Sequence, residues 1–340
     1  MSQRGGSTER NGRRVLVTGA SGFLGAYVMR EFHQQGYSLV ASGRDERRLA
    51  EALTPGAKAV VGDLGALAGS TLEVDTVVHC AALSSPWGRW RDFRAANVDG
   101  TAAVVDFARK NSVRRVVFVS SPSVYARPRD MLGITEDQVD PHNRLNHYIR
   151  SKIAAERLLQ RAYAAGDVPE LVVIRPRGLV GVEDPSLVPR LLDANARIGI
   201  PLFRGGTNVV DLTAVENVAL ALRLAVEAES ADGRVYNITN GEPREFGALA
   251  ASLLERIGVT PRFRHLNRTV AYAAAATIEA LYRVAPGNPE PPLTRYTLSA
   301  IAFSQTLDIS RARTELGYAP RVPLDDALDR VARSYAGRHV

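Results

Sequence analysis

Short apolar runs rich in β-branched residues alternate with longer segments of helical period along the first half of the chain. Uninterrupted apolar runs of this length are typical of strands buried on both faces of a parallel sheet. Strands that alternate with helices indicate an α/β fold with helices on both faces of the sheet. The pattern therefore predicts a doubly wound parallel sheet. Its predicted strands are 14–18, 37–42, 57–61, 75–80, 114–120 and 171–175.

A glycine-rich turn joins the first predicted strand to the first predicted helix. The strand at 14–18 is followed by G-A-S-G-F-L-G and then by a helical pattern that extends to about Gln35. Gly19 would allow the tight bend, Gly22 the close approach of a pyrophosphate, and Gly25 the close packing of helix on strand. The helix N-terminus would face the phosphates. Three glycines can also form a plain flexible turn, but the strand series that follows favours a Rossmann dinucleotide site.

The strand and helix alternation ends after Gly181, and the rest of the chain predicts a smaller C-terminal substrate-binding lobe. Helical periods occur at 184–199, before about Ile257 and after Pro323. We expect a disordered leader, a Rossmann domain and a substrate-binding lobe. The leader covers 1–12, the Rossmann domain 13–180 and about 206–238, and the lobe 181–205 and 239–338.

An alanine-rich run at 269–285 has three readings: a lid or core helix, an interfacial amphipathic helix, or a membrane span. The run is short for a span and is interrupted by Glu279 and Arg283. The preferred reading is a lid or core helix, with peripheral membrane contact left open. No signal peptide or other long uncharged apolar run is evident, so we expect a cytoplasmic protein.

Composition excludes several classes of function. The net charge is +7, and no basic run is interleaved with aromatic residues as nucleic-acid binding would require. The single cysteine, Cys80, permits no internal disulfide, and the six histidines show no metal-ligand spacing. We therefore expect neither nucleic acid nor a metal as a partner.

The stretch N-H-Y-I-R-S-K contains the strongest candidate for chemistry. The chain has 43 basic residues, of which only Lys58, Lys110 and Lys152 are lysines, and Lys152 follows Tyr148 by four residues. With so few lysines, Y-x-x-x-K should occur by chance about 0.1 times. On a helix this spacing places both side chains on one face, where the ammonium would lower the pKa of the phenol. The alternative is an exposed pair on an amphipathic helix.

The glycine spacing and several later motifs resemble the short-chain dehydrogenase/reductase superfamily, in its extended form, over about residues 13 to 336. The motifs are G-x-x-G-x-x-G, V-V-G-D-L, H-C-A-A, N-V-D-G-T at 97 to 101 and V-S-S-P-S-V-Y at 119 to 125. The resemblance implies a catalytic Ser121, with Ser123 as a fallback, together with Tyr148, Lys152 and Asn97. It also implies that Asp63 contacts the adenine. The full cofactor-binding set is Gly19, Ser21, Gly22, Phe23, Leu24, Gly25, Arg44, Asp63, Leu64, Ala81, Tyr148, Lys152 and Pro176.

The residues after the second strand bear on the choice of nicotinamide cofactor. Many NAD enzymes carry an acid there for the ribose hydroxyls, whereas this chain has Ser42, followed two residues later by Arg44. A guanidinium can hold a 2′-phosphate in a bidentate manner. The sequence therefore favours NADP(H), while Asp45 leaves NAD(H) open, although its expected role is to cap the next helix.

Hydride transfer to a carbonyl builds negative charge on the oxygen, so a nearby proton donor lowers the barrier. Tyr148 is the predicted acid, Ser121 would orient the carbonyl, and Lys152 would hold the nicotinamide ribose. The resemblance suggests that Asn97 orders a water linked to Lys152. Arg175 and Arg177 are candidates for phosphate binding or for ion pairs. The amide after Pro176 would meet the nicotinamide carboxamide.

Four stretches are most similar to the 3β-hydroxysteroid dehydrogenase branch, and within it to bacterial 2-alkyl-3-oxoalkanoate reductases. They are S-P-W-G-R-W-R-D-F at 85 to 93, R-P-R-G-L-V-G, N-G-E-P and P-E-P-P-L-T-R-Y at 289 to 296. The resemblance implies an NADP-dependent reductase of a ketone or 2-alkyl-3-keto acid with an apolar body. Trp87 and Trp90 would line the acyl channel or pack the loop.

Three other functions stay open, and a homodimer is implied by the resemblance. The alternatives are an NAD-dependent 3β-hydroxysteroid or sterol dehydrogenase, a nucleotide-sugar epimerase or dehydratase, and an inactive NAD(P)-sensing binding protein. The last has no need of Tyr148. In a dimer, the helices near 97 to 110 and 148 to 164 would pair with their copies.

Overall fold

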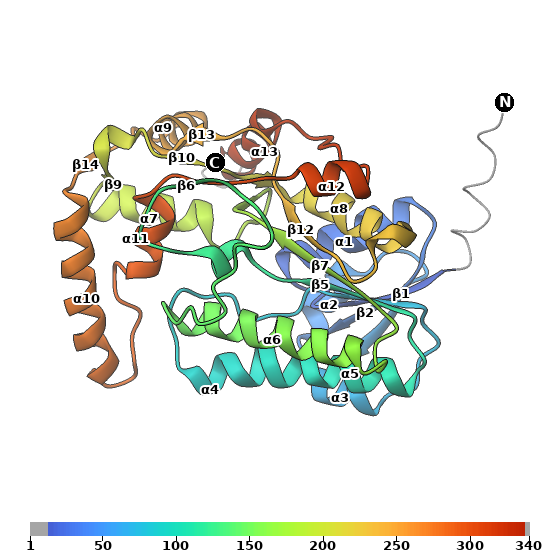
Figure 1. The fold of residues 1–340 in the computed structure, drawn as a ribbon. Helices are drawn as coiled ribbons and strands as arrows, with labels where there is room; N and C mark the ends of the chain where they lie inside the picture. The colour runs from blue at the N-terminus through green and yellow to red at the C-terminus, as the bar shows by residue number, and fades with distance from the viewer. Residues whose placement is uncertain (1–12, 337–340) are drawn as a thin grey trace.

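The computed structural model describes residues 13–336 and contains a seven-stranded, wholly parallel sheet (Figure 1). The strand order places β1 inside the sheet between β4 and β2, so that the chain winds outward first to one edge and then to the other. The fold class predicted from the apolar runs is confirmed. In spatial order the strands are β12 (Val235–Ile238), β7 (Glu170–Pro176), β5 (Arg115–Val119), β4 (Thr76–His79), β1 (Arg14–Thr18), β2 (Ser38–Gly43) and β3 (Lys58–Val61).

Helices cover both faces of this sheet because every central strand presents apolar side chains on both sides. One apolar core packs helices α1 (Phe23–Gln34) and α8 (Val215–Glu227) against the sheet, and the other packs α3 (Leu64–Gly69), α5 (Gly100–Lys110) and α6 (His147–Ala164). Figure 1 shows α5 and α6 running together below the sheet. A short helix, α2 (Glu46–Ala52), connects β2 to β3.

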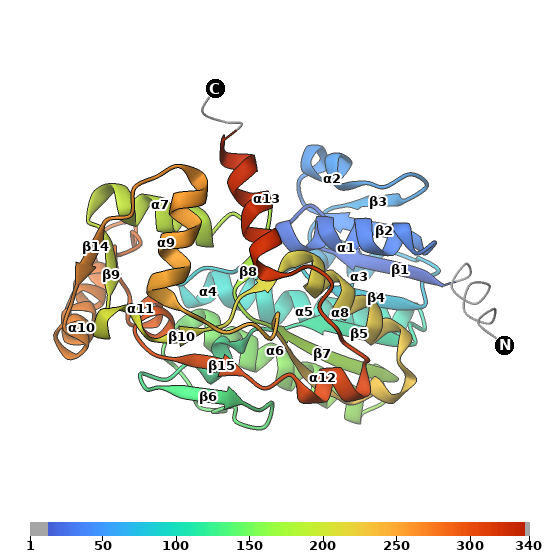
Figure 2. The same cartoon turned by 90° about the horizontal axis from the view of Figure 1, so that it is seen from above.

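A smaller lobe lies beyond the carboxyl end of the sheet, with α10 (Arg268–Val284) at its outer side (Figure 2). Its strands form one four-stranded and two two-stranded sheets. The strands are β6 (Met131–Ile134), β8 (Leu179–Val180), β9 (Ile200–Leu202), β10 (Val209–Val210), β11 (Thr213–Ala214), β13 (Arg244–Glu245), β14 (Phe263–His265) and β15 (Gln305–Leu307). The other helices are α7 (Leu187–Arg197), α9 (Phe246–Ile257), α11 (Arg295–Ile301), α12 (Ser310–Glu315) and α13 (Leu324–Ala336).

The six predicted strands agree with the observed ones to within one residue at every end, although β12 was not among them. One predicted helix begins late. Helix α7 starts at Leu187 instead of 184. The Asp184 carboxylate accepts backbone N–H bonds from Ser186, Leu187 and Val188, and so caps the helix from outside it. The predicted leader, 1–12, lies outside the described residues.

The run at 269–285 forms α10, whose two sides differ. Ala271, Ala275 and Glu279 are buried against the lobe, whereas Val270 and Leu281 are 68% and 63% exposed. Among the described residues, no helix has the length and hydropathy needed to cross a membrane. Helix α10 is therefore a half-buried helix of the lobe, and the choice between a lid or core helix and an interfacial helix stays a prediction.

Candidate active site at the carboxyl edge of the sheet

Tyr148 and Lys152 lie on the first two turns of α6 and are both buried. The helix begins at Asn146, whose side chain accepts a hydrogen bond from the backbone N–H of Ile149 at 2.8 Å. Lys152 is 2% exposed, donates to the carbonyl oxygen of Val119 at 2.8 Å, and lies 4.6 Å from the centre of the Phe118 ring. The exposed-pair reading of Y-x-x-x-K is therefore wrong.

The expected influence of Lys152 on Tyr148 is also wrong in this conformation. Burial raises the pKa of Tyr148, and the nearby hydroxyls of Ser121 and Ser84 lower it in part. The Lys152 ammonium does not contribute to the pKa of Tyr148, because it donates its hydrogen bond to the Val119 carbonyl. Tyr148 therefore keeps its proton at neutral pH, which is the state that a proton donor needs.

Ser121, rather than the fallback Ser123, is the serine beside the tyrosine. It follows β5 and caps a short 3₁₀ helix (Pro122–Tyr125) by accepting a hydrogen bond from the backbone N–H of Ser123 at 3.2 Å. The sequence reading did not select Ser84, which lies near the same phenol. The sequence does indicate that Ser84 lies at the carboxyl edge of the sheet, since it follows the H-C-A-A motif at the end of β4 by two residues.

Asn97 is buried in a π-helix (Arg94–Asp99), and its side chain bonds to two other segments of the protein. The amide nitrogen donates both hydrogens, to the Leu83 carbonyl at 3.0 Å and to Ser151 Oγ at 2.8 Å, and the amide oxygen accepts from the Leu83 N–H at 2.7 Å. Both amide hydrogens are used within the protein, and the water expected beside Asn97 stays a prediction. Asn97 therefore fixes the loop that carries Ser84 against α6.

A buried histidine lies near the lysine. His79 bonds to the hydroxyls of Thr18 at 2.7 Å and Thr101 at 3.1 Å. Burial and, to a smaller extent, the charge of Lys152 lower the pKa of His79 to about 3. The imidazole is therefore neutral, and Lys152 is the only charge of this pair at working pH.

The glycine loop has the shape that a dinucleotide phosphate requires. Gly19 has φ +67°, and a Cβ there would lie 2.8 Å from the backbone of Ala81. A Cβ on Gly25 would overlap the carbonyl oxygen of Gly19. Gly22, which precedes α1, provides no side-chain cap, so the helix N-terminus is open to an anion. These residues fit a pyrophosphate.

The remaining predicted cofactor residues lie along the same edge. Ser42 is buried at the end of β2, whereas Arg44 is exposed and has no hydrogen-bond or ion-pair partner within residues 13–336. Asp45 caps α2 by accepting from the Arg48 N–H at 3.0 Å, as predicted. Asp63 similarly caps α3, which begins at Leu64, and accepts from the Ala66 N–H at 2.8 Å.

The two arginines of R-P-R-G-L-V-G have different surroundings. Arg175 forms a buried bidentate ion pair with Glu156 at 2.6 and 2.9 Å, so it holds the fold together and is not free for a phosphate. The guanidinium of Arg177, two residues later, forms neither a hydrogen bond nor an ion pair with any other described residue.

Trp87 and Trp90 line a cavity of about 280 Å³ beside the N-terminus of α6. Trp87 donates to the Asn288 carbonyl at 3.3 Å, and the Arg150 guanidinium lies 3.8 Å from the centre of the Trp90 ring. Both tryptophans thus pack the loop and also form a cavity wall. No group of three or more His, Cys, Asp or Glu side chains suited to a metal ion occurs in the described part of the chain.

The fold and the site together define an NAD(P)-dependent oxidoreductase that acts on an alcohol or a carbonyl group. The family model for the NAD dependent epimerase/dehydratase family matches residues 15–239. The chain therefore belongs to that family, the extended short-chain dehydrogenases/reductases.

Several relatives are similar over nearly the whole chain. YbjS of Escherichia coli is 37% identical over 94% of this chain and 96% of its own length. A 2-alkyl-3-oxoalkanoate reductase of Stenotrophomonas maltophilia is 32% identical over 95% of this chain and 99% of its own. A mouse sterol-4-alpha-carboxylate 3-dehydrogenase, decarboxylating, is 30% identical over 95% of this chain and 91% of its own length.

Solved structures agree with the fold. The crystal structure of gox2253 has a TM-score of 0.77 at 28% identity and covers 96% of this chain and 98% of its own. MoeE5 in complex with UDP-glucose and NAD has a TM-score of 0.74 at 25% identity, and the match covers 96% of this chain and 100% of MoeE5.

The burial of Lys152 predicts that cofactor binding depends on pH. Burial lowers the pKa of Lys152 to about 8 from its ordinary 10.5, while Glu156 and Cys80 raise it in part. The ammonium is thus lost as the pH rises through about 8, and NADPH should bind about tenfold more weakly for each further pH unit. A titration of cofactor fluorescence between about pH 7 and pH 10 measures this.

Lys152→Arg is the matched control because its charge does not titrate in this range. Its affinity for NADPH should be independent of pH, yet most of the turnover should be lost, since a rigid guanidinium does not replace a compact ammonium. A wild-type affinity that stays constant to pH 10 would show that the Lys152 charge does not hold the cofactor.

Proposed function

We propose that the protein is an NADP-dependent reductase that interconverts a hydrophobic ketone or 2-alkyl-3-keto acid and its alcohol. The observation that carries this proposal is the placement of a protonated Tyr148 beside Ser121, one helical turn from the buried ammonium of Lys152. The 2-alkyl-3-oxoalkanoate reductase among the relatives supports the substrate class.

Each residue has a role that follows from the charge that the reaction develops. A bound nicotinamide would supply the hydride. Tyr148 donates its proton to the substrate oxygen, and Ser121 hydrogen-bonds the same oxygen and orients it. Lys152 would hold the ribose hydroxyls of a bound cofactor, while Asn97 keeps the loop at Leu83 and Ser84 in place.

A second candidate is an NAD-dependent sterol or 3β-hydroxysteroid dehydrogenase, which is favoured by the mouse relative at 30% identity. The chemistry at Tyr148 would be the same, and only the substrate pocket and the cofactor would differ. The nucleotide-sugar reading rests on structural neighbours such as MoeE5, at lower identity.

A substrate panel tests the proposed reaction. We expect NADPH to be oxidised in the presence of 2-alkyl-3-oxo acids, and Tyr148→Phe to lower kcat by about 10²- to 10⁴-fold because the proton donor is lost. Absorbance at the nicotinamide band measures both effects, and cofactor titration checks that the variant still binds NADPH.

The same panel contains ketosteroids and nucleotide sugars. Turnover confined to nucleotide sugars would contradict the proposed substrate class. A Tyr148→Phe variant that is as active as wild type would instead remove the proposed acid, and a wild type that binds cofactor but turns over no substrate would favour the sensing protein.

The preference for NADP rests on Arg44. This guanidinium is exposed, and no carboxylate competes for it in residues 13–336. We expect Arg44→Ala to weaken the binding of NADPH by about 1.5 to 3 kcal/mol, the range for a charged hydrogen bond. The binding of NADH should change much less.

The control for this prediction is Arg47→Ala, which removes an exposed arginine on α2 that pairs with Glu51. It should leave both affinities unchanged. Fluorescence titration with each cofactor measures the difference, and equal losses for NADPH and NADH in Arg44→Ala would refute the assignment.

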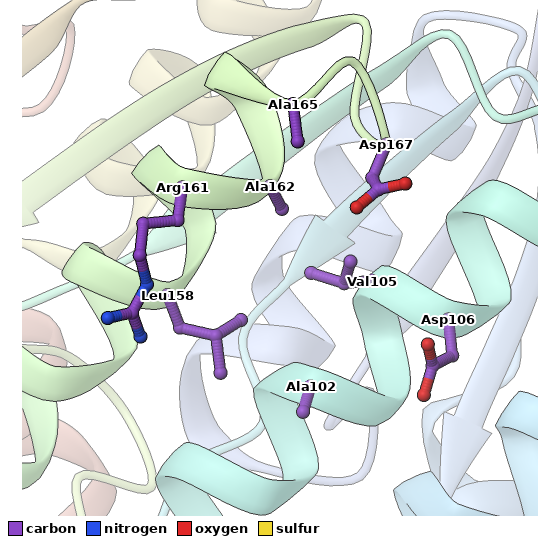
Figure 3. A pocket seen from close by; sticks show the side chains of 8 residues that line it. All are labelled: Ala102, Val105, Asp106, Leu158, Arg161, Ala162, Ala165 and Asp167. Carbon is purple, nitrogen blue, oxygen red and sulfur yellow. The ribbon is translucent and has the colours of Figure 1, made fainter.

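We also propose that the protein is a homodimer that pairs through α5 and α6. A hollow of about 360 Å³ lies between these helices, and Figure 3 shows its small and apolar side chains, Ala102, Val105, Leu158, Ala162 and Ala165. Charged side chains, Asp106, Arg161 and Asp167, surround them. Small residues would allow two copies of the helix pair to approach closely.

Leu158→Arg should convert the dimer to a monomer because it would place a guanidinium in the centre of this apolar contact. Sedimentation velocity measures the change. Gln160→Arg introduces the same side chain at an exposed position of α6 outside the hollow, and it should stay dimeric. A wild type that sediments as a monomer would end the proposal.

A further inference from the structure

Arg177 is a partly buried cation that forms no ion pair with any described residue. Its backbone is fixed, because its N–H donates to the Ile238 carbonyl at 3.0 Å and its carbonyl accepts from the Thr213 hydroxyl. Its guanidinium makes no hydrogen bond or ion pair within the described residues, although Arg175, two positions earlier, makes four hydrogen bonds. Such a desolvated cation needs a counter-charge.

Strand register brings Arg177 to the edge where the chemistry takes place. The Ser120 N–H donates to the Ile174 carbonyl at 2.8 Å, so the residues after β5 and after β7 lie next to each other. The first group contains Ser121 and Ser123, and the second contains Arg177. The hydroxyl oxygen of Ser123 is buried, and the phenol of Tyr296 lies beside it.

Tyr296 brings the substrate lobe into this cluster. It lies on α11 and packs against the apolar cluster that contains Val124 and Ile149, which follow Ser121 and Tyr148 in the sequence. Its phenol is within electrostatic range of both Tyr148 and Arg177. Burial raises its pKa to about 12, so it is a neutral hydrogen-bond donor.

We propose that Arg177 binds the carboxylate of a 3-oxo acid substrate while Tyr148 and Ser121 hold its ketone oxygen. This inference rests on the proposed reductase function and assigns a specificity-determining residue to it. A guanidinium matches both oxygens of a carboxylate, and the Tyr296 and Ser123 hydroxyls are the neutral donors beside it. The substrate carboxylate would supply the direct ion-pair partner that no described residue supplies.

The nearest acid does not fill this role. Asp211 lies close enough to attract Arg177 electrostatically, but the two form no ion pair. Its Oδ2 atom instead accepts the Leu307 N–H at 2.7 Å, which holds the carboxylate to the β15 backbone. The guanidinium is therefore left for a ligand.

The test compares an acid with its neutral ester. The probes are 2-methyl-3-hydroxydecanoic acid, which is stable to decarboxylation, and its methyl ester, each oxidised with NADP⁺. Wild type should prefer the acid in kcat/KM by at least about tenfold, the factor for one charged hydrogen bond. Arg177→Met should raise KM for the acid by about ten- to a hundredfold. The KM for the ester should stay within about threefold of the wild-type value.

Two further variants keep the result interpretable. Arg177→Lys retains the charge and should retain part of the preference for the acid, even where Arg177→Met folds poorly. Arg190→Met removes a neighbouring exposed arginine that pairs with Glu290, and it should leave the ratio of acid to ester unchanged.

Three outcomes overturn the inference. Equal losses for acid and ester in Arg177→Met would assign Arg177 a structural role. Wild-type turnover of both probes without preference for the acid would refute the carboxylate site alone and leave the reductase intact. Turnover of neither probe, nor of any other ketone or alcohol in the panel, would refute the reductase and this inference together.

Discussion

The buried ion pair between Arg175 and Glu156 fixes the helix on which the catalytic residues lie. Both side chains are less than a tenth exposed, and the carboxylate of Glu156 also accepts from the hydroxyl of Ser120. Removing one partner of such a pair typically costs about 3 to 5 kcal/mol, since it leaves an unpaired buried charge. Glu156 is one turn beyond Lys152 on α6. The position of the lysine, and of Tyr148 before it, therefore depends on this contact with β7.

The same pair connects the active site to the second lobe. Arg175 also donates to the Tyr125 hydroxyl at 2.6 Å and to the Glu136 carbonyl at 2.9 Å. The Tyr125 hydroxyl in turn donates to Asn237 on β12 at 2.8 Å, and the side chain of Asn237 donates to the Ile134 carbonyl on β6. One network of polar groups thus joins three segments: the segment after Ser121, strand β12 of the sheet and strand β6 of the lobe. Since every member is bonded to another, the network specifies one arrangement of the lobe against the sheet.

The sequence was sufficient to predict structure that is local in the chain. It was insufficient to predict structure that depends on contacts between distant residues. Apolar runs and glycines define a strand or turn by themselves, so β1 to β5, β7 and the loop at Gly19 could be predicted, whereas β6 and β12 were not predicted. Tyr148 and Lys152 could be paired because they share one helix. Tyr296 could not be placed beside Tyr148, since about 150 residues separate them and only tertiary packing brings them together. The pKa of Tyr148 was misjudged because the direction of the Lys152 side chain depends on its contact with Val119.

The distribution of buried cations separates structural from ligand-binding roles. Arg115, Arg175 and Arg223 are the fully buried arginines of the described chain, and each has a carboxylate partner: Glu170, Glu156, and Glu31 with Glu227. Lys152 and Arg177 have none within hydrogen-bonding reach, and burial lowers the pKa of both. They occur where the cofactor and the substrate would lie. Pairing them with protein acids would stabilise the free chain but would place a competing anion in the site. Glu156 and Asp211 offset these two charges only at a distance. The two cations therefore lower stability in exchange for affinity toward their ligands, and binding those ligands recovers it.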